Sequence, residues 1–230
     1  MKLNWLGHSG FRLEIENAVI LIDPWMTGNP TFPEARRQEA ISDATHILLT
    51  HGHGDHTADA LPIAKELNIP IVGIYDLINN WTTREGIEGI GFNKGGTVDL
   101  GGAKVTMVNA CHSSSIDGPD GPLYAGHESG YMIAGEGHVI YLSGDTDIMA
   151  DMEWMAEYHQ PDIGILCAGG HFTMDMKRAA FAARKYFDFK TVIPCHYKTF
   201  PLLEQSAEPL ISGLPGVTVI EPEILKVIEL

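Results

Sequence analysis

The sequence lacks the features that mark disulfide-rich and membrane-spanning proteins. Its 3 cysteines (Cys111, Cys167 and Cys195) are an odd number at wide spacing, which is no disulfide framework and leads us to expect a reducing compartment, the cytoplasm. No apolar run approaches the roughly 20 residues that a membrane-spanning helix needs. The first residues also lack the continuous apolar segment of a secretory signal. We therefore expect no association with a membrane.

Basic charge is also scarce. The chain has 15 lysines and arginines against 30 acidic residues, a formal net charge of −15. This balance argues against a long polyanion as partner, so we expect no nucleic acid. A small anionic substrate remains compatible, because the local charge of a metal ion can outweigh the field of the whole surface. A length of 230 residues predicts one domain, residues 1–230, while a homo-oligomer stays an open alternative.

Short apolar runs bounded by glycine, proline and asparagine alternate with segments of helical periodicity. This pattern predicts sheets packed together with helices outside them, a layered α/β sandwich. The expected strands lie near residues 2–6, 11–15, 18–23, 46–50, 71–74, 104–110, 131–135, 138–144, 162–168, 191–195, 217–220 and 224–228. The expected helices lie near residues 58–67, 76–84, 148–158, 177–187 and 202–211.

The segment HGHGDH, residues 51–56, follows one of these apolar runs. Imidazole nitrogens and carboxylate oxygens suit zinc, manganese or iron. Residues two apart in an extended chain point the same way, so His51 and His53 can share one ion. Asp55 and His56 lie just past the bend and can serve a second ion. The glycines between them permit backbone angles that are closed to other residues.

Three further strands end in the same types of side chain. His112 follows the run KVTMVNAC, Asp145 follows HVIYLSG, and His196 follows TVIPC. Loops at strand ends commonly carry functional groups, because the strands hold them in place. We expect these side chains to converge with HGHGDH. One ion needs about three protein ligands, so the full set predicts two adjacent ions that share one carboxylate.

This pattern resembles the metallo-β-lactamase superfamily, whose HxHxDH motif stands here as residues 51–56. The segments WLGHSGF, LIDPW, SGDT and PCHY are most similar to the small metal-dependent hydrolases near ascorbate-6-phosphate lactonase. The resemblance covers essentially the whole chain. It implies a four-layer αββα sandwich with the active site at the strand-end rim between the two sheets. It also implies hydrolysis of an ester, lactone or phosphoester bond of a small metabolite by a metal-bound, bridging hydroxide.

The resemblance assigns roles residue by residue. It implies two divalent ions, zinc or manganese with iron as an alternative, held by His51, His53 and His112 and by Asp55, His56 and His196, with Asp145 as the bridge. Asp55 would also orient the nucleophile or carry its proton. His8, in the GHSG loop, would contact the substrate or the metal-bound water. Asp23 would accept hydrogen bonds that fix the motif or an imidazole ligand.

Several alternatives stay open. The same fold hosts iron-dependent redox and oxygen chemistry, so a non-hydrolytic metalloprotein is the second interpretation. His171 follows an expected strand, but a loop or capping position is the simpler interpretation. Cys111 and Cys195 precede expected ligands and face away from them in an extended chain, so we expect them to be buried as small apolar residues.

Overall fold

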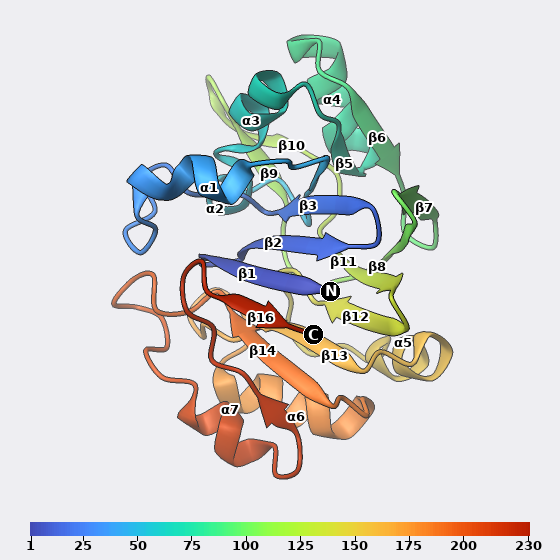
Figure 1. Cartoon of the computed structure of the whole chain (residues 1–230), viewed down its shortest axis with the longest axis vertical. Coiled ribbons are helices and arrows are strands. Elements are labelled where there is room, and N and C mark those ends of the chain that lie inside the picture. The colour runs from blue at the N-terminus through green and yellow to red at the C-terminus, as the bar shows by residue number, and fades with distance from the viewer.

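Two seven-stranded sheets form the centre of the computed structural model, which describes residues 1–230 (Figure 1). The strands of the first sheet, in spatial order, are β16 (Val227–Glu229), β1 (Lys2–Gly7), β2 (Gly10–Ile15), β3 (Ala18–Ile22), β4 (His46–Leu48), β5 (Ile71–Ile74) and β6 (Gly89–Phe92). Those of the second are β15 (Thr218–Val219), β14 (Thr191–Cys195), β13 (Ile163–Cys167), β12 (His138–Leu142), β11 (Ser129–Gly135), β8 (Ala103–Asn109) and β7 (Thr97–Leu100).

Helices cover the outer sides of the two sheets. Figure 1 shows α3 and α4 at the top beside β5 and β6, and α6 and α7 at the bottom below β14. The predicted layered α/β sandwich is therefore confirmed. The helical segments are η1 (Glu34–Arg36), α1 (Arg37–Ile41), α2 (Gly54–Thr57), α3 (Ala60–Leu67), α4 (Tyr75–Glu85), α5 (Met152–His159), α6 (Met176–Tyr186) and α7 (Glu208–Gly213).

The hydrophobic core is one cluster of 62 buried residues with members from both sheets and from the helices. Strands β5 and β13 are buried at every position, because a sheet face and a helix layer cover their two sides. Such strands are read from the sequence as continuous apolar runs rather than as alternating patterns. This explains why IVGI and IGILC were recognisable as strands without a period of two.

The strand directions bring particular chain ends to one edge. In the first sheet β3, β4, β5 and β6 are parallel, and β1 points the same way because β2 is antiparallel to both β1 and β3. In the second sheet β12, β13 and β14 are parallel, and β8 shares their direction through the antiparallel β11. The carboxyl ends of β1, β3 and β4 thus share one edge, as do those of β8, β12 and β14.

Some elements differ from the sequence predictions. The helix expected over 202–211 forms only at Glu208–Gly213, where Pro209 lies in the first turn, a position that its fixed φ favours. Strands β6 and β7 were not predicted, nor was the two-stranded sheet of β9 (Ser115–Gly118) and β10 (Gly121–Tyr124). These segments have few buried positions and several glycines, so their sequences carry little apolar patterning.

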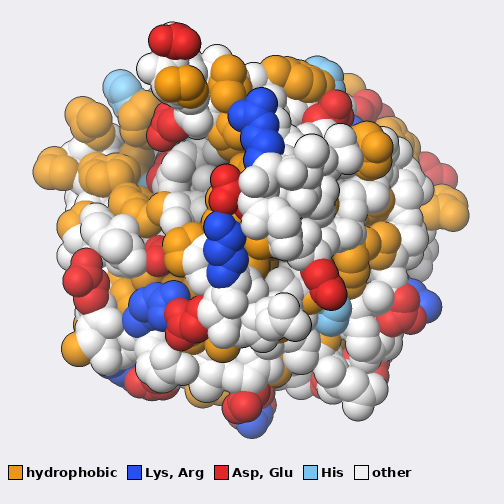
Figure 2. All heavy atoms as spheres, turned by 90° about the horizontal axis from the view of Figure 1, so that it is seen from above, with side chains coloured by type: hydrophobic (Ala, Val, Ile, Leu, Met, Phe, Trp, Pro, Cys, Tyr) orange, Lys and Arg blue, Asp and Glu red, His pale blue; other side chains and the backbone are white.

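The surface agrees with the composition. Figure 2 views the molecule from the side of α3 and α4 and shows acidic and basic side chains scattered among hydrophobic and uncharged ones. None of the helices is both long enough and apolar enough to cross a membrane.

Candidate metal centre

Three histidines form the first cluster, which we call the three-histidine cluster: His51, His53 and His112. His51 and His53 extend from the segment after β4, and His112 comes from the segment after β8 in the opposite sheet. One ring nitrogen from each lies within 4.8 Å of the others. His51 is fully buried, whereas His53 and His112 are half-buried. The predicted convergence of these three side chains is present.

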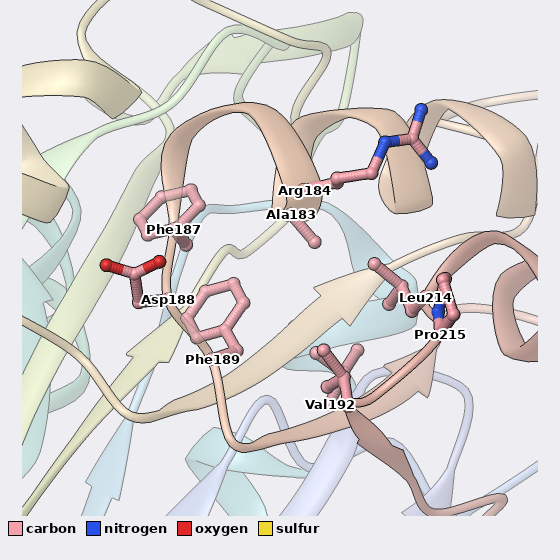
Figure 3. Close-up of a pocket in the computed structure, with 9 residues that line it drawn as sticks. Ala183, Arg184, Phe187, Asp188, Phe189, Val192, Leu214 and Pro215 are labelled. Atoms are coloured by element: carbon pink, nitrogen blue, oxygen red, sulfur yellow. The ribbon is translucent and has the colours of Figure 1, made fainter.

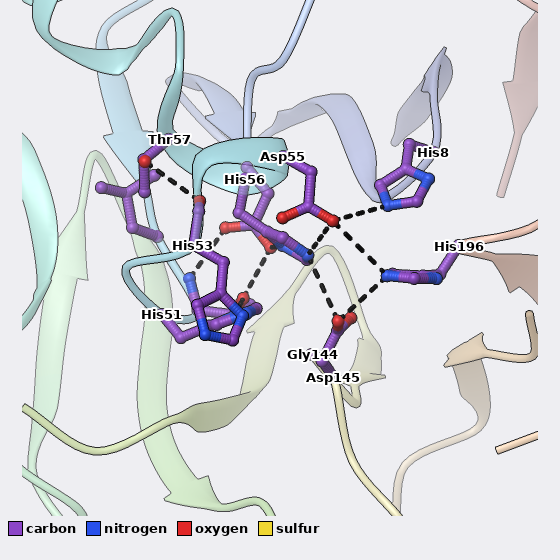
Figure 4. Close-up of polar contacts among 12 residues, drawn as sticks. His8, His51, His53, Asp55, His56, Thr57, Gly144, Asp145 and His196 are labelled. Carbon is purple, nitrogen blue, oxygen red and sulfur yellow. Dashed lines mark hydrogen bonds and ion pairs between the residues drawn. The ribbon is translucent and has the colours of Figure 1, made fainter. Parts of the chain in front are cut away.

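A second group, the mixed cluster, consists of His8, Asp55, His56 and His196, whose ligand atoms also lie within 4.8 Å of one another. Asp55 and His56 belong to α2, His196 follows β14 of the other sheet, and His8 follows β1. Oδ2 of Asp55 is 3.0 Å from Nε2 of His8, 3.8 Å from Nε2 of His196 and 4.0 Å from Nε2 of His56 (Figure 4).

Asp145 lies between the two clusters. Its Oδ2 atom is 3.1 Å from Nε2 of His196 and 3.4 Å from Nε2 of His56, both in the mixed cluster. The same oxygen is 3.7 Å from Nε2 of His112 in the three-histidine cluster. One carboxylate oxygen thus lies near imidazoles of both clusters.

Asp23 forms hydrogen bonds with the histidine motif and with Thr50, the residue that precedes it. Its carboxylate accepts hydrogen bonds from the backbone N–H of Thr50 at 2.8 Å, the Thr50 hydroxyl at 2.6 Å and Nδ1 of His56 at 2.8 Å. These are the contacts with the motif and with an imidazole that we expected of this residue. Because Nδ1 of His56 donates to Asp23, Nε2 is the ring nitrogen that faces Asp145.

Two buried polar atoms and the types of donor atom in the clusters indicate that a metal ion fits here. Nε2 of His56 and Oδ1 of Asp145 are buried and have no hydrogen-bond partner. A buried polar atom without a partner is costly, and a cation would satisfy both of these atoms. The donors are imidazole nitrogens and carboxylate oxygens, which are the ligand types that zinc, manganese and iron accept. The side chains present therefore fit a metal site.

The electrostatics of the centre favour ionised carboxylates and differ among the imidazoles. Burial opposes a charge on His56, but the carboxylates of Asp145, Asp23 and Asp55 raise its pKa well above the ordinary value. Burial lowers the pKa of His51 well below its ordinary value and that of His8 to about 4. Burial disfavours the ionised form of Asp145, yet the imidazoles of His196 and His56 lower its pKa well below the ordinary value. A neutral imidazole and an ionised carboxylate are the protonation states in which these groups bind metal ions.

Three residues of the centre have left-handed backbones. The φ angles of His8, Asp23 and His196 are 51°, 42° and 58°. Each such conformation costs roughly 1–3 kcal/mol for a residue other than glycine and persists only where the surroundings enforce it. Here the backbone N–H of His196 donates to the carbonyl of His8 at 2.9 Å, so the loops that follow β14 and β1 hold each other.

The sequence did not point to several supporting residues. Glu128 accepts the backbone N–H of His112 at 3.0 Å, and Thr199 Oγ1 lies 2.8 Å from Nδ1 of His8. Gly169 packs so closely on His196 that a β-carbon there would lie 1.9 Å from the His196 carbonyl oxygen. Only the last residue had a local signal, since the pair of glycines at 169–170 follows a buried strand.

Two cysteine expectations had different outcomes. Cys195 is buried, as expected of a small apolar residue. Cys111 is exposed, so the expectation of burial was wrong for it. The reason is that the chain leaves β8 at Asn109 and turns outward before His112, so the alternation of an extended strand no longer applies.

Two cavities have different relationships to the centre. One of about 680 Å³ is lined by His171, Asp175, Leu202–Ser206 and Gly169, the residue that packs on His196. His171 is an exposed loop residue outside both clusters, while Asp175 caps α6. The other, of about 320 Å³, lies between α6 and α7 (Figure 3). Its Val192 and Phe189 are near the start of β14, the end opposite to His196.

Comparisons with known proteins agree with this geometry. Residues 19–197 match the family model of the beta-lactamase superfamily domain. A UPF0173 metal-dependent hydrolase of Paracoccus denitrificans (strain Pd 1222) is 82% identical over 230 residues, which is 100% of both chains. A metallo hydrolase from the archaeon Ignicoccus hospitalis is 32% identical with a TM-score of 0.83, over 100% of this chain and 98% of that one.

A more distant structure shares the fold alone. CmlA, a diiron β-hydroxylase from Streptomyces venezuelae, is 15% identical with a TM-score of 0.74, and the match covers 100% of this chain and 54% of that one. The predicted resemblance is confirmed by the family model and by the relatives at high identity. The chain belongs to the metallo-β-lactamase superfamily and is a metal-dependent hydrolase of that family.

Proposed function

We propose that this protein hydrolyses an ester, lactone or phosphoester bond of a small metabolite at a centre of two divalent ions. Zinc or manganese fits the donor set best, and iron is the alternative. The observation that carries the proposal is the position of Asp145, whose Oδ2 lies 3.1 Å from His196 and 3.7 Å from His112. A carboxylate oxygen in contact with both clusters is suited to bridge two ions.

Each of the two ions is assigned its own set of side chains. In this proposal the three-histidine cluster holds one ion, Asp55, His56 and His196 hold the other, and Asp145 contacts both. Ions bound there would supply a nucleophile from water near neutral pH and would polarise the oxygen of the bond under attack. Asp23 fixes the ring of His56 through the 2.8 Å hydrogen bond to Nδ1, so that Nε2 faces the centre.

Asp55 is the acid best placed to handle a proton. Its side chain is 30% exposed, whereas that of Asp145 is 3% exposed. The Asp55 side chain is therefore accessible to water in part, while that of Asp145 is closed off. We assign to Asp55 the orientation of the attacking water and the acceptance of its proton, in addition to metal binding.

The surroundings of the centre favour a small anionic or electron-rich substrate. Two divalent ions beside two carboxylates leave a net positive charge despite the acidic surface. The nearby lysine does not supply that charge, because Nζ of Lys198 lies 3.1 Å from the carboxylate of Glu221. The free thiols support the cytoplasm as the location that we propose.

The proposal is tested on protein purified without added metal. Elemental analysis and an absorption spectrum come first, followed by a screen with zinc or manganese across lactones, phosphodiesters and thioesters. We expect two ions per chain, no visible bands and turnover of one substrate class. Asp145→Ala should lose turnover and the second equivalent of metal, whereas Asp120→Ala, at an exposed turn between β9 and β10, should keep both.

Other outcomes would overturn parts of the proposal. Visible bands from bound iron together with no hydrolysis in the screen would favour the redox interpretation. Retention of two ions by Asp145→Ala would contradict the bridging role. Failure of the wild-type protein to bind any divalent ion would contradict the centre as a whole.

A further inference from the structure

His8 occupies a fixed position at the carboxyl end of β1. Its side chain is fully buried, and its backbone has a φ of 51°. The His8 carbonyl accepts hydrogen bonds from the His196 N–H and from Nε1 of Trp5, both at 2.9 Å. The rings of His8 and His196 have centroids 3.9 Å apart. The strained backbone is thus tied directly to a predicted metal ligand, as expected of a site that needs this ring in one place.

The hydrogen bonds of the ring define its orientation. Nδ1 of His8 lies 2.8 Å from Oγ1 of Thr199, and the Thr199 hydroxyl donates to the carbonyl of Tyr197 at 3.3 Å. In the tautomer with a proton on Nδ1, that nitrogen donates to Oγ1 of Thr199 and Nε2 is free to bind a metal ion. Nε2 of His8 lies 3.0 Å from Oδ2 of Asp55, a hydrogen-bonding distance, so the second ring nitrogen faces the mixed cluster.

The separations suit a shared ion. Ligand atoms 2.0–2.2 Å from a tetrahedral metal ion lie about 3.3–3.6 Å from one another. Oδ2 of Asp55 is 3.0 Å from Nε2 of His8, 3.8 Å from that of His196 and 4.0 Å from that of His56. One separation is thus slightly shorter than this range and two are slightly longer. Figure 4 shows the ring nitrogens of His8 and His196 directed toward the same carboxylate.

We propose that His8 is a fourth protein ligand of the ion held by Asp55, His56 and His196, with Thr199 orienting its ring. The proposal rests on the two-ion centre proposed above and adds a residue that the HxHxDH motif and its downstream ligands do not include. A ligating histidine usually donates its other ring N–H to an oxygen, and Thr199 fills that role for His8.

This assignment makes the two sites unequal. An ion in the mixed cluster would have four protein donors with Asp145 beside it, which would fill its coordination, and His8, His56 and His196 are almost wholly buried. An ion in the three-histidine cluster would keep open positions, because His53 and His112 are only half-buried. Closed sites are typical of structural ions and open sites of catalytic ions. The substrate therefore approaches the ion of the three-histidine cluster.

The test uses the full chain, freed of metal and titrated with Co²⁺. Ligand histidines of bound Co²⁺ give paramagnetically shifted N–H proton signals, while histidines that only form hydrogen bonds to a ligand do not. We expect the wild-type protein to bind two equivalents. His8→Gln should lose one shifted signal and weaken the second equivalent about 10–100-fold, with the first unchanged. His127→Gln, at an exposed histidine outside both clusters, should match the wild type.

The possible results separate this inference from the proposed function. If wild-type protein binds fewer than two equivalents, the two-ion centre itself is wrong. If it binds two and His8→Gln keeps every shifted signal, His8 is not a ligand, even where the second equivalent binds more weakly. Should His8→Gln fail to fold, Thr199→Val replaces it. That variant keeps the ring and should move one shifted signal, and an unaltered spectrum would overturn the assignment.

Discussion

Nδ1 of His56 donates a hydrogen bond of 2.8 Å to Oδ2 of Asp23, a residue 33 positions earlier in the chain. The same carboxylate also holds the N–H and hydroxyl of Thr50. Asp23 follows β3 and Thr50 follows β4, so one buried side chain ties the ends of two parallel strands to a predicted ligand. This arrangement fixes the orientation of the His56 ring, with Nε2 toward the centre, in the metal-free protein.

Asp23→Asn should weaken the mixed cluster. An amide has only one accepting oxygen and cannot take all three hydrogen bonds. We expect the second metal equivalent to bind about 10–100-fold more weakly and the metal-free protein to lose about 1–3 kcal/mol of stability. Competition with a chelator and denaturant unfolding measure the two effects. Asp120→Asn is the matched control, and equal affinities in both variants would contradict the role of Asp23.

His53→Ala should affect the other cluster. The side chain is half-buried, so its removal should leave the fold intact while the three-histidine cluster loses a donor. We expect metal-dependent turnover to be abolished and the first equivalent of metal to be lost. Metal analysis and activity on the substrate found in the screen measure this, with circular dichroism as the check on folding. A variant with unchanged activity and metal content would refute the assignment.

Gly169→Ala should displace His196. The added β-carbon would lie 1.9 Å from the His196 carbonyl oxygen and 3.0 Å from its Nδ1, so the loop after β14 has to move. Forced overpacking typically costs 1–3 kcal/mol. We expect that loss of stability together with weaker binding of the ion held by His196. Thermal unfolding and Co²⁺ titration measure the two, and wild-type behaviour in both would show that the loop yields without effect.

Asp162 should make stability depend on pH. Burial disfavours its ionised form, but the backbone N–H of Val139 at 3.0 Å and Nδ1 of His138 at 2.7 Å hold its pKa below the ordinary value. A carboxyl whose pKa is lower in the folded state stabilises the protein above the unfolded pKa and loses that contribution as pH falls through the folded pKa.

The pH effect is measured on metal-free protein. Asp162→Asn should be about 1–3 kcal/mol less stable than wild type near pH 7. The difference should shrink below about pH 4, the pKa of an unperturbed aspartate. Urea unfolding at several pH values gives both quantities. A difference that stays constant down to pH 3 would show that ionisation of Asp162 is not its source.

The sequence revealed most of the candidate centre because its residues carry local signals. His51, His53, Asp55 and His56 stand in one short segment, and the downstream residues each follow an apolar run that forms a buried strand. Because the strands that precede these residues run in the same direction within each sheet, the residues at their carboxyl ends come to a common edge. The motif and the strand ends together were therefore sufficient to predict the convergence.

The remaining features depend on contacts between loops, which leave no periodic signal. The contact of His8 with Thr199 joins residues 191 positions apart, and that of His112 with Glu128 depends on the path of a loop. The β9–β10 hairpin has no fully buried residue, so nothing in its patterning distinguishes it from a loop. Exposure of Cys111 likewise follows from where the chain leaves β8.

Each cluster takes ligands from both halves of the sandwich, since His51, His53, Asp55 and His56 follow β4 while His112 and His196 follow strands of the other sheet. Bound ions would consequently act as cross-links between the halves. Binding to the native state alone adds its free energy to that of folding. The resistance of this protein to denaturation would then vary with the free concentration of the metal, and a chelator would act as a denaturant.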